Sequence, residues 1–262
     1  MPKGPITLTT DFGTRDHFVG AMKGVILSIA PRARIVDITH GIAPYAIAEA
    51  AFAIDQIWRH FPKGTIHVLV IDPGVGSARR PILAEAGGQF FIAPDNGVLT
   101  AIYDSGRHKV QVVSNPKLMS KQISRTFHGR DVFAPAAAHL ARGVPAARFG
   151  KRIDDYVRMP FLKPAALAPN RWTGTVLKID NFGNMITNFR FEGFREIETR
   201  PFEMRVGGHR IRRMARTFSD AASGELAAIP GSSGFIEIAA NLASAARVVG
   251  GAPGDPVELA MF

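Results

Sequence analysis

The sequence predicts an α/β domain with a mostly parallel central sheet, followed by a smaller all-β, barrel-like or sandwich domain. Strand-like and helix-like segments alternate over residues 5–145, which is typical of a parallel sheet covered by helices on both faces. The following segment is rich in proline, which favours an extended linker over another helix. We therefore expect an α/β domain at 1–160, a linker at 161–170 and a β-barrel-like domain at 171–262.

The first domain alternates short apolar runs with longer amphipathic segments. Residues 65–71 are apolar enough for a central strand that is buried on both faces. Pro31 ends the first helical pattern, and Gly87 with Gly88 indicates a hairpin. We expect strands at 6–10, 34–39, 65–71, 82–86, 89–93 and 109–113, and helices at 17–30 and 45–61.

The second domain consists of short strand-like runs separated by Gly, Asn and Asp turns. Gly207 and Gly208 predict a hairpin turn within a basic stretch. We expect strands at 172–179, 201–206, 209–214, 225–229, 234–240 and 255–261, and one helix at 241–249.

Composition excludes several classes of protein. The chain has no cysteine, which excludes disulfides, thiolate metal sites and cysteine nucleophiles and favours a reducing cytoplasm. No apolar run is long enough to span a bilayer, and the first strand follows the N-terminus without an apolar signal region. We expect a cytoplasmic protein that does not bind membranes.

The net charge of +10 suggests a nucleic-acid partner as one interpretation. The densest basic stretch covers residues 205–216. An excess of arginine over lysine together with abundant alanine also follows from genome base composition alone. Because no nucleic-acid motif and no interleaved aromatic residues accompany the charge, we expect no nucleic-acid partner.

Three motifs place reactive side chains where strands give way to loops. They are TTDFGTRD at 9–16, IDPGVGSARR at 71–80 and TFHGRD at 126–131. Open α/β sheets bind ligands beyond the carboxyl ends of their strands, so we expect Asp72, Arg79 and His128 to meet in one site. A carboxylate, a guanidinium and an imidazole can together position and activate a water molecule.

The first two motifs also have a purely structural interpretation. Asp11 and Asp16 can cap the following helix instead of binding a ligand. Asp72 and Arg79 can form a structural ion pair around a tight turn. The glycine-rich loop lacks both the GK[ST] ending of a P-loop and the GxGxxG spacing of a dinucleotide site.

The histidines suggest a metal site only weakly. His40, His60 and His67 show no metal-ligand spacing, and neither does His128 with Asp131. We expect no metal and no cofactor.

The order of motifs along the chain resembles a known enzyme family. It includes LTTDFGTRDHFVGAMKG, HGIAPYAIAEAA, IAPDNGVLT, FAPAAAHLARG, IDNFGNMITN and GSSGFIEIAANLASAA. In this respect the chain is similar to the S-adenosylmethionine (SAM) hydrolases that form adenosine, relatives of the fluorinase and chlorinase. The resemblance covers nearly the whole chain and implies SAM as substrate, with adenosine and methionine as products.

For this substrate, side-chain chemistry assigns roles to the three polar residues. An Asp beside Arg stays anionic, so Asp72 would hold and polarise a water, and Arg79 would orient Asp72 and favour a hydroxide-like water. His128 is better poised to accept the proton as methionine leaves. The resemblance implies further roles. The implied substrate contacts are Asp11 and Tyr45 at the ribose, Asp16 at the methionine end, Phe127 near the reacting carbon, Asp180 at the ammonium group, Phe182 and Asn184 at the adenine, and Ser232 and Ser233 at the methionine carboxylate. Gly129 is a further expected substrate contact.

The family further implies a homotrimer whose sites lie between subunits. Two alternatives remain open. One is halide transfer to C5′, although the halogenating relatives lack the Asp/His pair and the fluorinase carries a long insertion where this chain has AEAGGQFF. The other is a non-catalytic protein that binds adenosine or nucleic acid.

Overall fold

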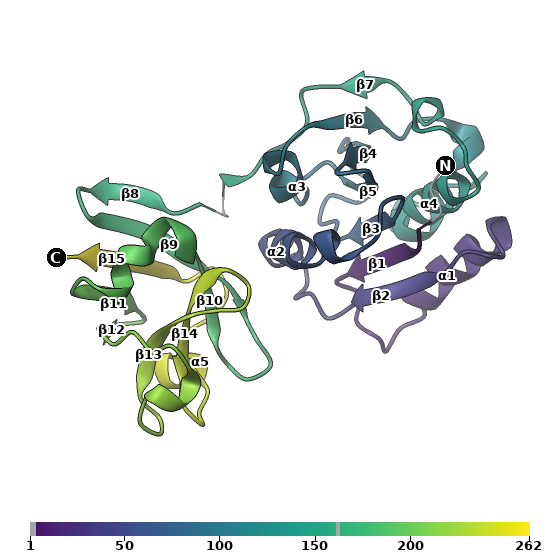
Figure 1. The fold of residues 1–262 in the computed structure, drawn as a ribbon. Helices are drawn as coiled ribbons and strands as arrows, with labels where there is room; N and C mark the ends of the chain where they lie inside the picture. Colours follow the sequence, from purple (N-terminus) through teal and green to yellow (C-terminus); the bar gives the residue numbers. More distant parts are fainter. Residues whose placement is uncertain (1–3, 161–162) are drawn as a thin grey trace. The chain divides into compact units, whose positions relative to one another are not determined.

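The computed structural model describes residues 4–160 and 163–262. The chain forms two compact units, Met1–Met159 and Pro160–Phe262 (Figure 1). Within the expected linker, residues 161–162 lie outside the described part of the chain. Residues Ala165–Ala168 form strand β8, which pairs with β9 (Arg171–Ile179). The later part of the proline-rich segment therefore belongs to the sheet of the second unit.

The first unit contains a seven-stranded sheet with helices on both faces. The strand order is β2-β1-β3-β5-β4-β6-β7. Its elements are β1 (Ile6–Thr10), α1 (Phe18–Ile29), β2 (Ile35–Thr39), α2 (Ile47–Ile57), β3 (Ile66–Val70), β4 (Pro81–Ala86), β5 (Gln89–Pro94), α3 (Thr100–Asp104), β6 (His108–Val112), α4 (Ala134–Ala141) and β7 (Arg152–Ile153).

The centre of this sheet is parallel, as the alternation of strands and helices predicts. Strands β2, β1, β3 and β5 run in the same direction. The other half is antiparallel, because the predicted hairpin at Gly87 and Gly88 returns the chain from β4 to β5, and β6 and β7 continue that pattern. Every residue of β3 is buried, which confirms the expected central strand.

Side-chain alternation along the strands separates two packed layers. Ile6 and Leu8 of β1 pack with apolar residues of α1 and α4 on one face. Figure 1 shows α1 and α4 together, with α2 on the other side of the sheet. On that second face the His67 ring of β3 stacks on Phe91 of β5, and Phe91 contacts Trp58 after α2. Both faces are therefore covered, and the carboxyl ends of β1 and β3 lie side by side.

The second unit is an eight-stranded antiparallel sheet that nearly closes on itself. Its order is β12-β11-β15-β9-β10-β14-β13, with β8 beside β9. Backbone hydrogen bonds join Ala228 of β13 to Arg213 and Ala215, beyond β12. Its other elements are β10 (Met185–Arg190), β11 (Phe202–Val206), β12 (His209–Ile211), β13 (Leu226–Pro230), β14 (Phe235–Ala240), α5 (Ala245–Val249) and β15 (Pro256–Met261). This nearly closed sheet confirms the barrel-like domain.

Candidate active site

The loop after β3 folds back so that Arg79 meets Asp72. Arg79 Nε donates to Asp72 Oδ1 at 2.8 Å, and Arg79 Nη2 donates to Asp72 Oδ2, which makes the contact bidentate. Only 6% of the Asp72 side chain and 10% of the Arg79 side chain are exposed. The Ser77 hydroxyl donates to the carbonyl of Gly74 and accepts from the Arg79 amide, which shapes the return of the loop. A bidentate pair this well buried holds both groups in one fixed orientation.

Gly76 lets this loop lie against the segment that carries His128. Its φ of 76° is in the left-handed region, and a Cβ there would overlap the carbonyl oxygen of Arg125. Any side chain at residue 76 would therefore push the two loops apart.

His128, from a separate segment of the chain, is the third member of the cluster. It precedes a π-helical turn at Gly129–Phe133, and its Nδ1 lies 2.7 Å from Arg79 Nη2. Burial lowers the pKa of the imidazole below its ordinary value and the Arg79 guanidinium lowers it further, while Asp72 and Asp131 act in the opposite direction. The ring is therefore neutral at pH 7.

The contact with Arg79 also assigns the tautomer of His128. Arginine only donates hydrogen bonds, so Nδ1 is the acceptor and the neutral ring carries its hydrogen on Nε2. The imidazole can take up a second proton only at Nδ1, and it must then give up this contact.

One nitrogen of the Arg79 guanidinium donates no hydrogen bond to the described residues. Its Nη1 is buried without a hydrogen-bond partner among residues 4–160 and 163–262. The guanidinium carbon lies 5.2 Å from the centre of the Phe133 ring. A buried donor without a partner favours an acceptor supplied from outside the chain, such as the oxygen of a bound nucleophile.

Asp11 and Tyr45 form a second polar contact at this end of the sheet. The Tyr45 amide donates to Asp11 Oδ2 at 3.0 Å. Tyr45 has a φ of 67°, which is uncommon for a residue with a side chain, and its ring is largely exposed. Burial is the main cause that raises the pKa of Asp11, opposed by this hydrogen bond.

A cavity of about 340 Å³ joins these groups. Three aromatic rings, those of Phe12, Phe18 and Phe127, pack on one another beside the polar cluster, with centroids 5.0–5.9 Å apart. The cavity is lined by Asp11, Phe12, Phe18, Pro44, Tyr45, Val70, Asp72, Val75, Thr126, Phe127, His128 and Gly129. The structure thus brings together seven of the residues named from the sequence, although Arg79 lies just behind the lining.

Asp16 lies apart from this group. It is exposed and is absent from the cavity lining. The N-cap residue of α1 is His17, and no side chain makes a capping hydrogen bond at that helix end. The capping interpretation of Asp16 therefore gains no support, and its role in binding methionine stays a prediction.

The second unit holds its own group of predicted residues. Asp180 Oδ1 accepts from the amides of Phe182 and Asn184, and Oδ2 accepts from Asn184 Nδ2. The Phe182 ring is 78% exposed. A cavity of about 810 Å³ lies here, lined by Asp180–Asn184, Phe218, Ala240–Ser244 and Arg247. Asp180 therefore shapes the loop that presents Phe182.

Ser232 and Ser233 lie at the turn between β13 and β14, outside that cavity lining. The Ser233 hydroxyl donates to Glu237 Oε1 at 3.3 Å. Burial raises the pKa of Glu237, and the Asp180 charge adds to the effect. The two serines stay predictions as carboxylate contacts.

Family models match both units of the chain. The N-terminal domain of SAM hydroxide adenosyltransferases matches residues 6–150, and the C-terminal domain of the same enzymes matches residues 174–258. The chain belongs to the SAM hydroxide adenosyltransferase family. The resemblance inferred from the motifs is thereby confirmed.

Individual members of this family are similar along nearly the whole chain. The (R)-S-adenosyl-L-methionine hydrolase of Salinispora arenicola is 38% identical over 97% of both chains. The protein of that name from Thermus thermophilus is 36% identical over 97% of this chain and 99% of its own. A fluorinase from Nocardia brasiliensis is 30% identical over 92% of this chain and 91% of its own.

Solved structures show the same architecture. A conserved protein from Thermotoga maritima superposes with a TM-score of 0.88 at 37% identity, over 97% of this chain and 99% of that one. A second structure, from Thermus thermophilus, gives 0.77 at 32% identity, over 98% and 99%.

Several residues that line the two cavities of this chain were not predicted as site residues from the sequence. In the second unit Leu242, with a φ of 55° and a side chain that is 89% exposed, lines the same cavity as Asn241 and Phe218. An apolar side chain at a turn is the one signal that marks Leu242. In the first unit Phe12 lies inside the first motif, but its ring was not assigned to a ligand.

The described residues offer neither a metal-binding cluster nor a membrane-spanning helix. Within the described ranges no group of three or more His, Asp or Glu residues could hold a metal ion. His40 Nδ1 instead contacts the Thr10 hydroxyl at 2.9 Å, and His67 lies in a buried network with Thr7 and Gln89. No described helix is both long and apolar enough to span a membrane.

Proposed function

We propose that this chain hydrolyses SAM to adenosine and L-methionine, with water displacing methionine at the ribose C5′. The observation that carries the proposal is the buried cluster of Asp72, Arg79 and His128 at a cavity. Similarity to SAM hydrolases over 97% of the chain supports it. The cluster faces the carboxyl ends of neighbouring parallel strands, where α/β sheets bind ligands.

The reaction needs a placed and activated water more than it needs an acid. A bond forms between the water oxygen and C5′, and the C5′–S bond breaks with its electron pair moving to the positive sulfur. The leaving thioether is neutral and needs no proton. One proton of the water must be removed, and general-base help of this kind contributes roughly 10²–10⁴-fold.

Each member of the cluster has a role in this step. Asp72, held by two Arg79 nitrogens, accepts a hydrogen bond from the water and fixes its direction. The buried Arg79 Nη1 stabilises the oxygen as it becomes hydroxide-like. His128 accepts the proton at Nδ1, replacing its contact with Arg79, and passes it to solvent.

Halide transfer to C5′ is the main rival within the family. The Asp72 and His128 pair favours water, since a halide ion has no proton to give up. The hydrolases are also more similar to this chain than the fluorinases, at 36–38% against 28–31% identity. Bromide or chloride added to the reaction should therefore give no 5′-halogenated nucleoside.

We also propose the homotrimer that the family resemblance implies, with residues of both units completing each substrate site. Its support is that the predicted contacts divide between two cavities, one in each unit. Asp72→Asn subunits refolded together with Asp180→Ala subunits should recover activity. Mixtures as inactive as their parents, when wild-type subunits refold actively, would place each site within a single chain.

The absence of cysteine supports a cytoplasmic enzyme.

Product analysis tests the proposed function. Purified protein incubated with SAM should give equal amounts of adenosine and methionine by mass-resolved chromatography, with and without a chelator. Asp72→Asn serves as the matched inactive variant. Turnover that persists in high salt, without a shift of labelled nucleic acid, separates the enzyme from a nucleic-acid-binding protein. Wild-type protein that leaves SAM intact would refute the proposal.

A further inference from the structure

The loop that carries Asp72 and Arg79 connects two strands that lie on either side of β5. We call residues 72–79 the catalytic loop. It follows β3 and leads into β4, while β5 lies between these two strands in the sheet. Asp95 and Asn96 come directly after β5. These two residues are therefore placed between the two ends of the catalytic loop.

Asn96 holds the start of the catalytic loop. Its Nδ2 donates to the carbonyl of Ile71 at 2.9 Å, and Ile71 directly precedes Asp72. Its Oδ1 accepts from the Val98 amide at 3.2 Å, which fixes the direction of the side-chain amide. The residue before Asp72 is thus tied to the end of the neighbouring strand.

Asp95 holds the other end of the loop through both its backbone and its side chain. The Asp95 amide donates to the carbonyl of Arg80 at 2.8 Å. Its Oδ2 accepts from Arg80 Nε at 2.9 Å and from Arg80 Nη2 at 2.7 Å. The Asp95 side chain is only 1% exposed, and two charged hydrogen bonds to a buried carboxylate keep the guanidinium in one orientation. Arg80 directly follows Arg79, so these contacts fix the point where the loop enters β4.

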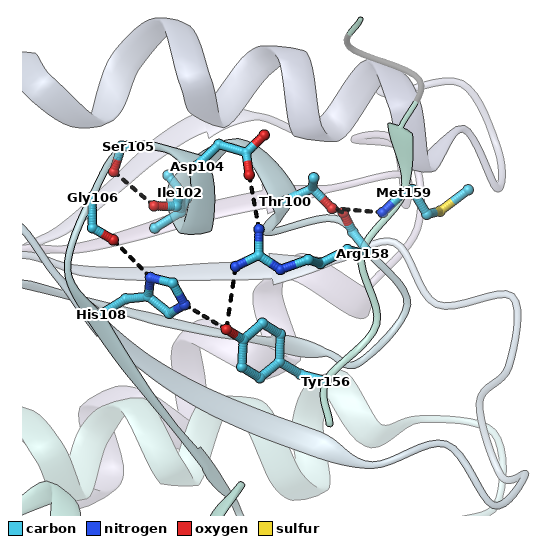
Figure 2. Close-up of polar contacts among 10 residues, drawn as sticks. Thr100, Ile102, Asp104, Ser105, Gly106, His108, Tyr156, Arg158 and Met159 are labelled. Carbon is cyan, nitrogen blue, oxygen red and sulfur yellow. Dashed lines mark hydrogen bonds and ion pairs between the residues drawn. The ribbon is translucent and has the colours of Figure 1, made fainter. Parts of the chain in front are cut away.

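The segment after β5 is itself held in place by contacts outside the catalytic loop. Asp95 Oδ1 accepts from the Val157 amide at 2.8 Å. Figure 2 shows a second contact, in which the Thr100 hydroxyl accepts from the Met159 amide at 2.9 Å. The same hydroxyl donates to the carbonyl of Gly97 at 2.7 Å. All of these residues belong to the first unit, so the support for the loop lies within that unit.

We propose that Asp95 and Asn96 are positioning residues, which fix the two ends of the catalytic loop and so direct Asp72 and Arg79 at the attacking water. The inference rests on the proposed function, in which Asp72 and Arg79 act on that water. Both positioning residues belong to the motif IAPDNGVLT, which has no other role in the proposed reaction. Neither residue lines the cavity of the first unit, so both act through the loop.

Release of either end should slow the reaction without weakening SAM binding. The SAM contacts proposed at Asp11, Tyr45 and Phe127 come from other segments of the chain. Asp72 and Arg79 act on the water, and a misplacement of about 1 Å at a reacting group can cost about 100-fold in rate. We therefore expect kcat to fall about 10- to 100-fold while the affinity for SAM stays unchanged.

Two variants of the full chain each release one end of the loop. Asn96→Ser keeps a hydroxyl that can accept from the Val98 amide, but serine is too short to reach the carbonyl of Ile71. Asp95→Asn removes the negative charge that holds the Arg80 guanidinium.

Asn115→Ser is the matched control. Asn115 Nδ2 donates to the carbonyl of Arg148 at 2.8 Å, and its Oδ1 accepts from the Lys117 amide at 3.0 Å. It thus makes the same two kinds of hydrogen bond as Asn96, and both asparagines are partly buried. The segments that Asn115 joins carry no residue of the proposed site, so its replacement should leave kcat unchanged.

The measurements are kcat from steady-state rates, SAM affinity from calorimetry and stability from thermal unfolding. We expect a lower kcat at unchanged affinity in Asn96→Ser and in Asp95→Asn. In an Asp72→Asn background, Asn96→Ser should lower kcat less than it does alone, because the effects of residues that act as a unit are not additive.

Three results would overturn the inference while leaving the proposed function in place. The first is an unchanged kcat in Asn96→Ser, which decides against the inference even if Asp95→Asn fails to fold. The second is an equal fall in kcat in Asn96→Ser and Asn115→Ser, since the effect would then be one of stability alone. The third is full additivity of Asn96→Ser with Asp72→Asn. A wild type that does not hydrolyse SAM would refute the proposed function, and the inference with it.

Discussion

Acidification should destabilise the first unit through a single buried histidine. The His67 side chain is fully buried, and its Nδ1 accepts from the Thr7 hydroxyl at 2.8 Å. Its Nε2 donates to Gln89 Oε1 at 2.6 Å, and Gln89 Nε2 donates to the carbonyls of Trp58 and Phe61. With a neutral imidazole, every side-chain polar atom of this network has a hydrogen-bond partner.

The size of the effect follows from the pKa of His67. Burial lowers that pKa from its ordinary 6.5 to about 4. In the unfolded chain the ring therefore takes up a proton at higher pH than in the folded protein. Stability that is present above pH 6.5 is lost as the pH falls toward 4. At about 1.36 kcal/mol for each pKa unit, the loss from pH 7 to pH 5 is about 2 kcal/mol, a large share of the roughly 5–15 kcal/mol that stabilises a domain.

Urea unfolding at pH 7 and pH 5 measures this loss. Trp58 is in the first unit and Trp172 in the second, and the chain has no other tryptophan, so a Trp172→Phe background makes fluorescence report on the first unit alone. His67→Gln in that background keeps a neutral polar side chain. Its free energy of unfolding should fall by about 2 kcal/mol less between the two pH values than that of the background. Equal losses in both proteins would refute the assignment.

Three further predictions concern the proposed reaction. Asp72→Asn should lower kcat by about 10²–10⁴-fold with little change in SAM affinity by calorimetry, whereas a retained kcat would mark the ion pair as structural. The acidic limb of the kcat profile should lie below pH 6.5, because burial and Arg79 lower the pKa of His128; a limb above 6.5 would contradict the neutral ring. Asp11→Ala should weaken SAM binding more than it slows turnover, as measured by the same calorimetry and kinetics. A large fall in kcat with little loss of SAM affinity would instead place Asp11 in the chemical step.

Much of the fold could be predicted because local pattern and burial agree. The apolar run at 65–71 is β3, and the Gly87 and Gly207 turns form the expected hairpins, since glycine accepts the positive φ that these turns require. The pairing of β6 with β4 depends on contacts distant in sequence, so no local pattern indicates it.

Other features depend on the tertiary environment. Strand β10 begins inside the motif IDNFGNMITN and was not among the expected strands. Gly183 marks a turn there, but the buried positions of the following residues are fixed by pairing with β9 and β14. The expected helix at 45–61 begins only at Ile47, because Tyr45 has a positive φ. The helix expected at 241–249 is shortened to Ala245–Val249, since Leu242 also has a positive φ.

The candidate site was predictable in its residue types more than in its hydrogen bonds. Strand ends indicated that Asp72, Arg79 and His128 would meet, and the structure places them in contact. The tautomer of His128 depends on which nitrogen faces Arg79, and no spacing of residues encodes that. The π-helical turn that begins at Gly129 is likewise determined by packing.

The most direct test of the account is the fate of the oxygen of water. The protein is incubated with SAM in water enriched in oxygen-18, and the products are separated and their masses measured by mass spectrometry. Attack at C5′ by a water held at Asp72, Arg79 and His128 predicts one heavy oxygen in the 5′-hydroxyl of adenosine and none in methionine. Unlabelled adenosine, or cleavage on the other side of the sulfur to give methylthioadenosine and labelled homoserine, would contradict it.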